Sequence, residues 1–177
     1  MYVTLLGDSW RTLDETIRTF HDAAARSRRA YGVFRVREGG NVLARAIARL
    51  GRLPRAGDAV SVSLVVTPQP DGEQWRRTFD GSPLISTQRI DGSCVVERFG
   101  VVDIRFGLEA VDGALRYGFR SASMRFGRFA VPLPLIAAVQ ERARADGGLD
   151  VSVDVAMKWI GRIVAYDGAL TRFEVER

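Results

Sequence analysis

The spacing of apolar and polar residues divides the chain into a short helical part and a longer part made of strands, with the change near Asp58. Before that point, Thr12-x-x-Glu15 matches a capping box, in which each side chain bonds a free amide of the first helical turn. Leu13 and Ile17 then begin an apolar series at helical spacing. We therefore expect a first helix that starts beside Thr12.

A second helix is predicted between Asn41 and Gly51, because asparagine caps a first turn well and glycine ends a last turn. Its expected buried stripe is formed by Val42, Leu43, Ala46, Ile47 and Leu50. A different face carries Arg45, Arg49 and Arg52. Such a row is usually a solvated face, and the alternative is an anionic partner bound along it.

From residue 58 onward apolar and polar residues alternate, which is typical of half-buried strands, and short turns rich in glycine and aspartate separate them. The segment 137–157 also permits a helix in its first half, but the turn at 145–148 and the alternation over residues 149–155 favour a hairpin. We expect about nine or ten strands, and a meander of that length closes or bends strongly because a flat one keeps two wet edges.

The predicted fold class is therefore α+β, mainly β: a single β-rich domain over residues 1–177 with two N-terminal helices. We expect an antiparallel barrel or a strongly curved sheet, lipocalin-like or helix-grip-like. Barrels of this size often hold one small ligand in their mouth or interior.

Composition narrows the classes of function. The chain is 46% hydrophobic, has no apolar run approaching the roughly 20 residues of a membrane span, and starts without a basic secretion signal, so we expect a cytoplasmic protein. The net charge is +5 and the pI about 10.1, but the cations are spread along the chain and all except Lys158 are arginine. That pattern indicates codon bias of a high-GC bacterium more than a phosphate-binding surface, and nucleic acid is not an expected partner.

Familiar catalytic and cofactor motifs are missing from the sequence. It contains no GxGxxG, GxxxxGK[ST] or GxSxG, so we expect no dinucleotide, nucleotide or serine-hydrolase site. A single histidine, His21, and a single cysteine, Cys94, do not suffice for a histidine or thiolate metal centre. We expect Cys94 to be a packing residue, and His21 to be either a locally bonded boundary residue or a ligand contact. The prediction is no cofactor and no metal.

Polar residues on apolar strand faces carry the remaining chemistry. Alternation turns Arg77 to the same side as Trp75 and Phe79, and it turns Arg76 outward. A buried arginine needs a partner, because an unpaired buried charge costs several kcal/mol. The best candidate is Glu97, on a strand face farther along the meander. The pair is either a core ion pair or part of a ligand site.

In the ligand-site interpretation, Glu97 is a general base, and Arg77 and Tyr117 hold or protonate a carbonyl oxygen. Since Arg120 and Arg125 differ in parity, at most one of them faces the interior without a bulge. The expected substrate contacts are Trp75, Phe79, Phe99, Phe119, Arg125, Tyr166 and His21.

The sequence also carries an ordered series of short motifs. They are Trp75-x-Arg77-x-Phe79, Ser86, Glu97-Arg98-x-Gly100, Arg125-x-Gly127 with Pro132 and Pro134, and Gly161 with Tyr166-x-Gly168-x-Leu170. Taken in this order, the series resembles the domain-of-unknown-function family numbered 4166, from about Leu5 to Leu170. The resemblance implies no established activity, although members sometimes follow a saccharopine-dehydrogenase-like or other dinucleotide-binding domain.

Two functions are compatible with these observations. The first is a barrel that encloses a small hydrophobic molecule and acts on it as a cofactor-independent cyclase or isomerase in bacterial specialised metabolism. The second is a non-catalytic module that binds a hydrophobic ligand or docks on a separate dinucleotide-binding oxidoreductase. A homodimer is a further partner arrangement that the sequence leaves open.

Overall fold

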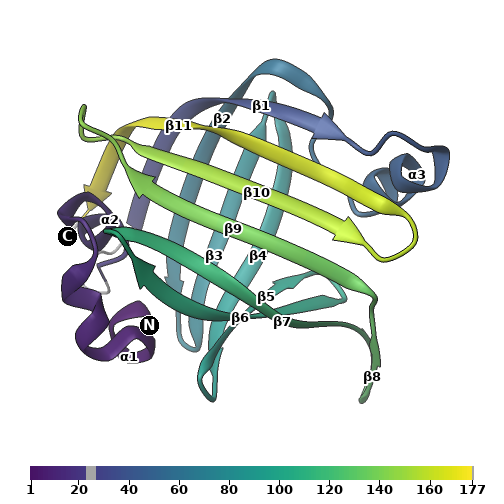
Figure 1. Ribbon diagram of the computed structural model, residues 1–177, viewed down its shortest axis with the longest axis horizontal. Coiled ribbons are helices and arrows are strands. Elements are labelled where there is room, and N and C mark those ends of the chain that lie inside the picture. Colours follow the sequence, from purple (N-terminus) through teal and green to yellow (C-terminus); the bar gives the residue numbers. More distant parts are fainter. Residues whose placement is uncertain (23–26, 177) are drawn as a thin grey trace.

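The structure is a computed structural model that describes residues 1–22 and 27–176. It is an antiparallel β-barrel with short helices at its two ends (Figure 1). The strands are β1 (Ser27–Glu38), β2 (Gly57–Gln69), β3 (Gly72–Phe79), β4 (Ser82–Asp91), β5 (Cys94–Phe99), β6 (Val102–Val111), β7 (Ala114–Phe126), β8 (Phe129–Pro132), β9 (Leu135–Ala143), β10 (Leu149–Met157) and β11 (Gly161–Glu176).

The sheet closes on itself. Its order is β6-β5-β4-β3-β2-β1-β11-β10-β9-β7-β8, and β6 also pairs with β7, from Val102 opposite Met124 to Val111 opposite Ala114. The ring therefore contains 10 strands, and the short β8 is added to β7 outside it. The predicted barrel is confirmed, and the segment with two interpretations is the hairpin of β9 and β10.

Every neighbouring pair of strands in the ring is antiparallel, so successive connections alternate between the two ends of the barrel. One end, which we call the closed end, carries α1 (Tyr2–Leu6), the 3-10 helix η1 (Gly7–Thr12) and α2 (Glu15–Phe20). The other, which we call the open end, carries α3 (Val42–Leu50) and the turns after β3, β5, β7 and β10. Figure 1 shows the two groups of helices on opposite sides of the barrel.

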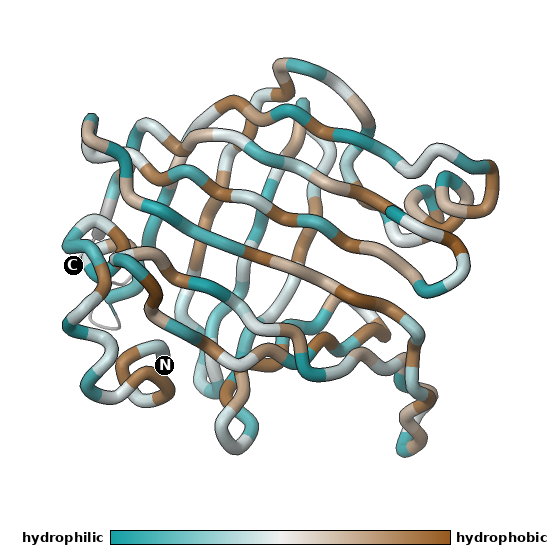
Figure 2. Tube along the Cα trace, viewed as in Figure 1, coloured by the Kyte–Doolittle hydropathy of each residue, from teal (hydrophilic) through white to brown (hydrophobic). Residues whose placement is uncertain are grey.

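Alternation along the strands fills the interior with apolar side chains. On β2, Val60, Val62, Leu64 and Val66 are buried, and the residues between them are exposed or half-buried. Figure 2 shows the same change from hydrophobic to hydrophilic along the strands. Side chains of α1 and α2, among them Tyr2 and Phe20, join this core and cover the closed end.

The start of the N-terminal helical region differs from the prediction. Asp14, not Thr12, caps α2, because its side chain accepts a hydrogen bond from the amide of Thr16. The Thr12 hydroxyl instead donates to the carbonyl of Ser9. Helix α1 was not predicted, since five residues are too few for an apolar period to be recognised.

Helix α3 has the predicted caps, but the side of the helix that packs against the barrel is not the predicted one. Asn41 accepts a hydrogen bond from the amide of Ala44, and Gly51 follows the last turn. The buried side is formed by Ala44 and Ala48, which pack against Ile163 of β11. Most of the predicted buried stripe is exposed instead, because alanines allow the helix axis to approach the strand more closely than larger side chains would. The exposed members are Val42, Leu43, Ala46 and Leu50.

A close approach between β1 and β11 explains the glycine of the Tyr166-x-Gly168 motif. A Cβ atom at position 168 would lie 2.3 Å from the carbonyl oxygen of Val33 and 2.6 Å from the ring of Phe34. Only glycine permits this contact, because both neighbouring groups are fixed by strand pairing and packing. The ring of Phe34 thereby reaches that of Tyr166, with 6.1 Å between centroids.

Candidate functional site

The barrel interior contains a cavity of about 840 Å³ that runs from the open end toward the helices of the closed end. Its walls are mainly aliphatic and aromatic side chains from β2, β3, β9, β10 and β11. At the open end, Ile47 and Leu53 beside α3 and Val101 in the turn after β5 line it. Near the closed end, Phe20 of α2 lines it. A volume of this size is typical of a site for one small organic molecule.

The predicted ion pair lies in the wall of this cavity. Nη2 of Arg77 donates to Oε1 of Glu97 over 3.0 Å, and Nη1 donates to the hydroxyl of Ser86 over 2.9 Å. Ser86 in turn donates to the same Oε1 of Glu97 over 2.6 Å. Arg76 is exposed, so the expected division of the two neighbouring arginines is confirmed.

Several hydrogen-bonding groups of this wall remain free for a ligand. The Arg77 guanidinium has five N–H donors, and Ser86 and Glu97 each take one. Both hydrogen bonds to Glu97 reach Oε1, so Oε2 has none within residues 1–22 and 27–176. Burial is the largest influence on the pKa of Arg77 and lowers it, but the charge and hydrogen bond of Glu97 together with Tyr166 and Tyr117 outweigh burial, so the net pKa is raised and the arginine stays charged.

Tyr166 adds a donor to the same wall. Its ring packs on Phe79 at 5.2 Å between centroids, and Phe79 lies two residues from Arg77 on the same strand face. The hydroxyl of Tyr166 has no hydrogen-bond partner in the described part of the chain. Burial raises the pKa of this hydroxyl, although the nearby charge of Arg77 opposes the rise. The group is therefore a neutral donor at ordinary pH.

A second group of hydrogen-bonded polar side chains lies near the closed end. Nε2 of His21 lies 2.6 Å from Oε2 of Glu141, and the Tyr117 hydroxyl donates to Oε1 of Glu141 over 3.1 Å. The hydroxyls of Tyr117 and Tyr2 are 3.2 Å apart, and Tyr2 donates to Oε1 of Gln88 over 2.6 Å. These hydrogen bonds therefore link α1 and α2 to β4, β7 and β9.

Burial and hydrogen bonding determine the pKa values, and so the charges, of these side chains. Burial raises the pKa of the Tyr2 and Tyr117 hydroxyls, and nearby carboxylates including Glu141 raise it further. For Glu141 burial alone would raise the pKa, but the charge and hydrogen bond of His21 and the hydrogen bond of Tyr117 lower it below its ordinary value. Glu141 is therefore a buried carboxylate that depends on His21 for compensation.

A buried ion pair supports the same end. Arg28 at the start of β1 bonds Glu73 of β3 and donates to the carbonyl of Phe20 over 3.0 Å. Glu73 also accepts a hydrogen bond of 3.1 Å from the indole of Trp75. These contacts hold α2 and the floor of the cavity to two strands.

The structure brings most of the predicted site residues to this cavity. Trp75, Phe79 and Phe99 line it together with Arg77, Glu97, Tyr117 and Tyr166. His21 does not line the cavity, but it is buried against Glu141, which does. His21 is the predicted boundary residue, since it is the C-cap of α2 and its amide bonds the carbonyl of Ile17, but its side chain also reaches Glu141, 120 residues away, which local spacing did not predict.

Two predicted contacts lie elsewhere. Arg125 is exposed on the outside of β7, where its Nη1 is 3.7 Å from Oδ2 of Asp103. Phe119 is half-buried beside the core but does not line the cavity. A bulge shifts the register of β6 and β7, so that Phe106 faces Phe119 while Arg105 faces Ser121. Strict alternation across this bulge therefore does not predict which side chains point inward.

Three polar residues of the site were not predicted. Glu141 lies on a segment that also permits a helix, so its inward position on β9 could not be assigned with certainty from spacing. Gln88 alternates with Ser86 and Leu84 on the inward face of β4, which was a usable signal. Tyr2 had none, because its partners are 86 and 115 residues away.

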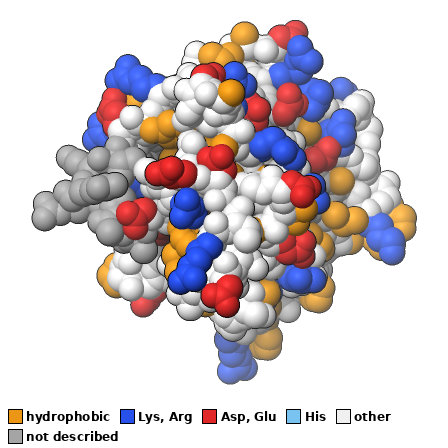
Figure 3. All heavy atoms as spheres, turned by 60° about the vertical axis from the view of Figure 1, so that its left-hand side comes forward, with side chains coloured by type: hydrophobic (Ala, Val, Ile, Leu, Met, Phe, Trp, Pro, Cys, Tyr) orange, Lys and Arg blue, Asp and Glu red, His pale blue; other side chains and the backbone are white. Residues whose placement is uncertain are grey.

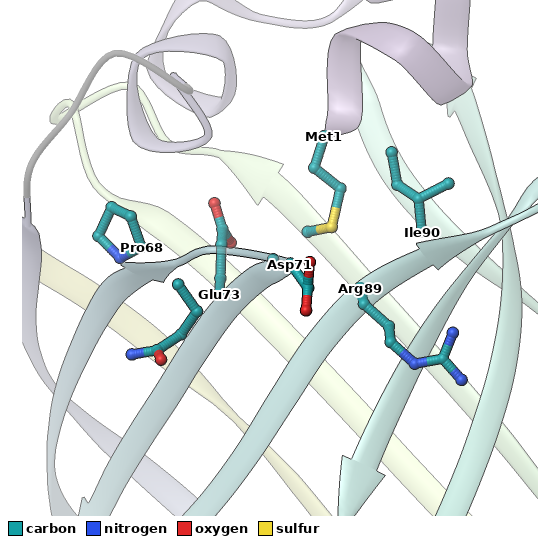
Figure 4. A pocket seen from close by; sticks show the side chains of 8 residues that line it. Met1, Pro68, Asp71, Glu73, Arg89 and Ile90 are labelled. Carbon is teal, nitrogen blue, oxygen red and sulfur yellow. The ribbon is translucent and has the colours of Figure 1, made fainter.

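A second hollow, of about 660 Å³, lies on the surface near the closed end (Figure 4). Met1 and Ile90 border it on one side, and the turn between β2 and β3 with Asp71 borders it on the other. Four of its eight lining residues are exposed and Glu73 alone is buried, so it is a solvent-facing depression and we assign no site to it. Among residues 1–22 and 27–176, no group of three His, Cys, Asp or Glu side chains is placed to hold a metal ion.

Comparison with known proteins agrees with the motif series. The model of the domain-of-unknown-function family DUF4166 matches residues 13–170. No curated protein and no solved structure matches the chain. The match covers most of the barrel and all residues of the two hydrogen-bonded groups described above except Tyr2. The protein chain therefore belongs to the DUF4166 family.

Proposed function

We propose that this barrel binds one small, largely apolar molecule in its interior, with a polar group of the ligand held at Arg77 and Tyr166. The observation that carries the proposal is the cavity of about 840 Å³ with an apolar lining and a few convergent polar groups. The donors of Arg77 and the hydroxyl of Tyr166 that have no partner among the described residues suit a carbonyl, carboxylate or sulfonate oxygen.

A titration with 1-anilinonaphthalene-8-sulfonate tests this proposal, because the probe combines apolar rings with one anionic group and becomes fluorescent in apolar surroundings. We expect saturable binding at one site per barrel. Val153→Trp should abolish it by filling the cavity, since Val153 on β10 lines the wall. The matched control is Ser152→Trp, on the same strand but exposed on the outside, and it should bind as the wild type does.

The two tryptophan variants keep the result interpretable. Circular dichroism and the melting temperature should show that both variants fold. If Val153→Trp is unfolded, Val139→Phe, a smaller addition to the same wall, replaces it. Equal affinity of folded inward and outward variants would place the probe outside the barrel and contradict the proposal.

A second candidate function is proton transfer on the bound molecule, as in a cofactor-independent isomerase or cyclase. The observation that favours it is the free Oε2 of Glu97 beside the donors of Arg77. Glu97 would remove a proton from the carbon next to a carbonyl, and Arg77 with Tyr166 would hold the oxygen of the resulting enolate. The protonated Glu97 would then return the proton to another carbon, so no further reactant is needed.

Solvent deuterium exchange tests this chemistry without knowledge of the natural substrate. The ketone 2-tetralone is small and apolar, and nuclear magnetic resonance measures deuterium incorporation next to its carbonyl. We expect exchange faster than in buffer and a decrease of about 10²-fold or more with Glu97→Gln. Exchange that is unchanged by Glu97→Gln, in a variant that still binds the fluorescent probe, would leave binding as the only function of the cavity.

A further inference from the structure

The open end of the barrel exposes apolar side chains that a protein surface usually buries. Leu50 is 86% exposed, Trp159 84%, Val42 75% and Phe129 63%. They come from three separate connections, namely α3, the turn between β10 and β11, and β8. Because alternate connections of an antiparallel barrel share one end, these residues surround the same mouth. We call this group, with Leu43 and Val131, the apolar rim.

Helix α3 is amphipathic away from the barrel. Its packing side is Ala44 and Ala48, and the opposite side presents Val42, Ala46 and Leu50 to solvent. Arg45 and Arg49 form a stripe beside this apolar side. A helix with one apolar and one basic face is typical of segments that lie in a membrane interface.

The turn between β10 and β11 presents a tryptophan in an unfavourable backbone conformation. Trp159 has φ 65°, a region that bulky residues rarely adopt. Its ring is exposed, and Nζ of Lys158 lies 5.0 Å from the ring centroid. At β8 the guanidinium of Arg128 lies 5.0 Å from the ring of Phe129 in the same way. Aromatic rings next to cations are the side chains that membrane interfaces favour.

The charge of the connections differs between the two ends. At the open end the connections carry the cations Arg45, Arg49, Arg52, Arg55, Arg128 and Lys158, with Asp80 as the acid. Other charges nearby are on strands: Arg162 pairs with Asp154 and Arg35 with Asp58, while the carboxylate of Glu38 accepts a hydrogen bond from the amide of Ala56. Figure 3, which brings the closed end forward, shows acidic and basic side chains interspersed there.

We propose that the apolar rim and its cations dock the mouth of the barrel on an anionic lipid bilayer. The cations complement a negative surface, and the apolar rim requires an apolar phase behind it, which a bilayer supplies. A second copy of the chain fits less well, because two rims face to face would oppose like charges. No described helix has the length and apolar character to cross a bilayer.

Sedimentation with vesicles tests this proposal. The probes are vesicles of phosphatidylcholine alone and vesicles of phosphatidylcholine and phosphatidylglycerol in equal parts. We expect binding to the mixed vesicles that weakens as salt is raised. Leu50→Ser with Trp159→Ser should weaken it at least about tenfold. Arg49→Gln and Arg128→Gln should each weaken it about fivefold on mixed vesicles, the contribution of one cation near such a surface.

Matched controls separate the rim from the rest of the surface. Val3→Ser with Arg11→Gln removes one exposed apolar residue and one cation at the closed end and should not change vesicle binding. Val153→Trp fills the cavity and should also bind vesicles normally, so failure of ligand binding and failure of docking are distinguishable.

Three results would overturn the proposal. The first is no binding to mixed vesicles. The second is an equal loss of binding in the rim variant and in the closed-end control. The third is a dimer in solution that Leu50→Ser with Trp159→Ser dissociates, which would identify a second copy as the occupant of the rim.

Discussion

The two ends of the barrel differ in which side chains they bury and which they expose. At the closed end, polar groups such as Arg28, Glu73 and Glu141 are buried and bonded to partners far away in the sequence. At the open end, apolar groups such as Leu50 and Trp159 are exposed. The buried hydrogen bonds and ion pairs of the closed end thus hold its helices on the strands, while the open end is where the cavity begins. Stability and function are therefore expected to depend on different ends.

The largest expected effect is on the buried ion pair of the closed end. Arg28→Met leaves Glu73 buried without its charged partner, and we expect it to lower the free energy of unfolding by about 3–5 kcal/mol, measured by urea denaturation. The control is Arg172→Met, which removes an arginine of the exposed pair with Glu174 and should give no measurable change. Equal effects of both would show that burial of the Arg28–Glu73 pair does not increase its contribution to stability.

The next effect is on ligand affinity at the cavity wall. Tyr166→Phe removes the free hydroxyl beside Arg77 and should weaken binding of the sulfonate probe about tenfold, the usual contribution of one hydrogen bond to a charged group. Its stability should hardly change, because that hydroxyl has no hydrogen-bond partner among the described residues. The matched control is Tyr31→Phe, on the outside of β1 beside Arg172, and an equal loss there would argue against the assigned site.

The pH dependence of stability tests the His21–Glu141 pair. The pKa of Glu141 is lowered in the folded protein, so the unfolded chain takes up its proton first as the pH falls. The stabilisation is complete above the ordinary value of 4.5 and is lost as the pH falls through the folded-state pKa. Other carboxyls with lowered pKa values, such as Asp103 and Asp146, add to the slope of the wild type.

The contribution of Glu141 is isolated by comparing the wild type with Glu141→Gln over the acid range. The difference in free energy of unfolding between the two proteins should shrink as the pH falls below 4.5. A difference that stays constant there would mean that the carboxyl binds its proton equally in both states.

The smallest stability effect is expected at the open end. Leu50→Ser should change the free energy of unfolding by less than about 0.5 kcal/mol, because the side chain is almost fully exposed. Leu115→Ala, in the core near the closed end, should cost about 2–5 kcal/mol in the same denaturation experiment. A large loss with Leu50→Ser would show that the rim is packed and unavailable for docking.

The regular part of the fold could be predicted from the sequence because alternation is a local signal. It placed Arg77 and Glu97 on the same side of the sheet, and their charges required a partnership across two strands. Features that depend on distant contacts or on irregular backbone could not be predicted. Tyr2 joins the site only through tertiary packing, and the bulge after Phe119 cancels the alternation that would have turned Arg125 inward.

Helix α3 shows a different limit of prediction from the sequence. Its apolar period was recognised, but the side that faces the protein was not, because the small side chains of Ala44 and Ala48 pack more closely than the larger ones. Hydrophobicity alone therefore predicted the buried side wrongly, and the apolar side it selected is the one the structure leaves exposed. This exposed apolar side is part of the rim that we propose docks on a bilayer.

A crystal structure with 1-anilinonaphthalene-8-sulfonate bound would show directly whether the barrel interior is the ligand site. We expect density for the probe inside the barrel, with its rings among the apolar walls and its sulfonate within hydrogen-bond distance of Arg77 and the Tyr166 hydroxyl. Density for the probe only on the outer surface, or an interior filled by side chains, would contradict this expectation.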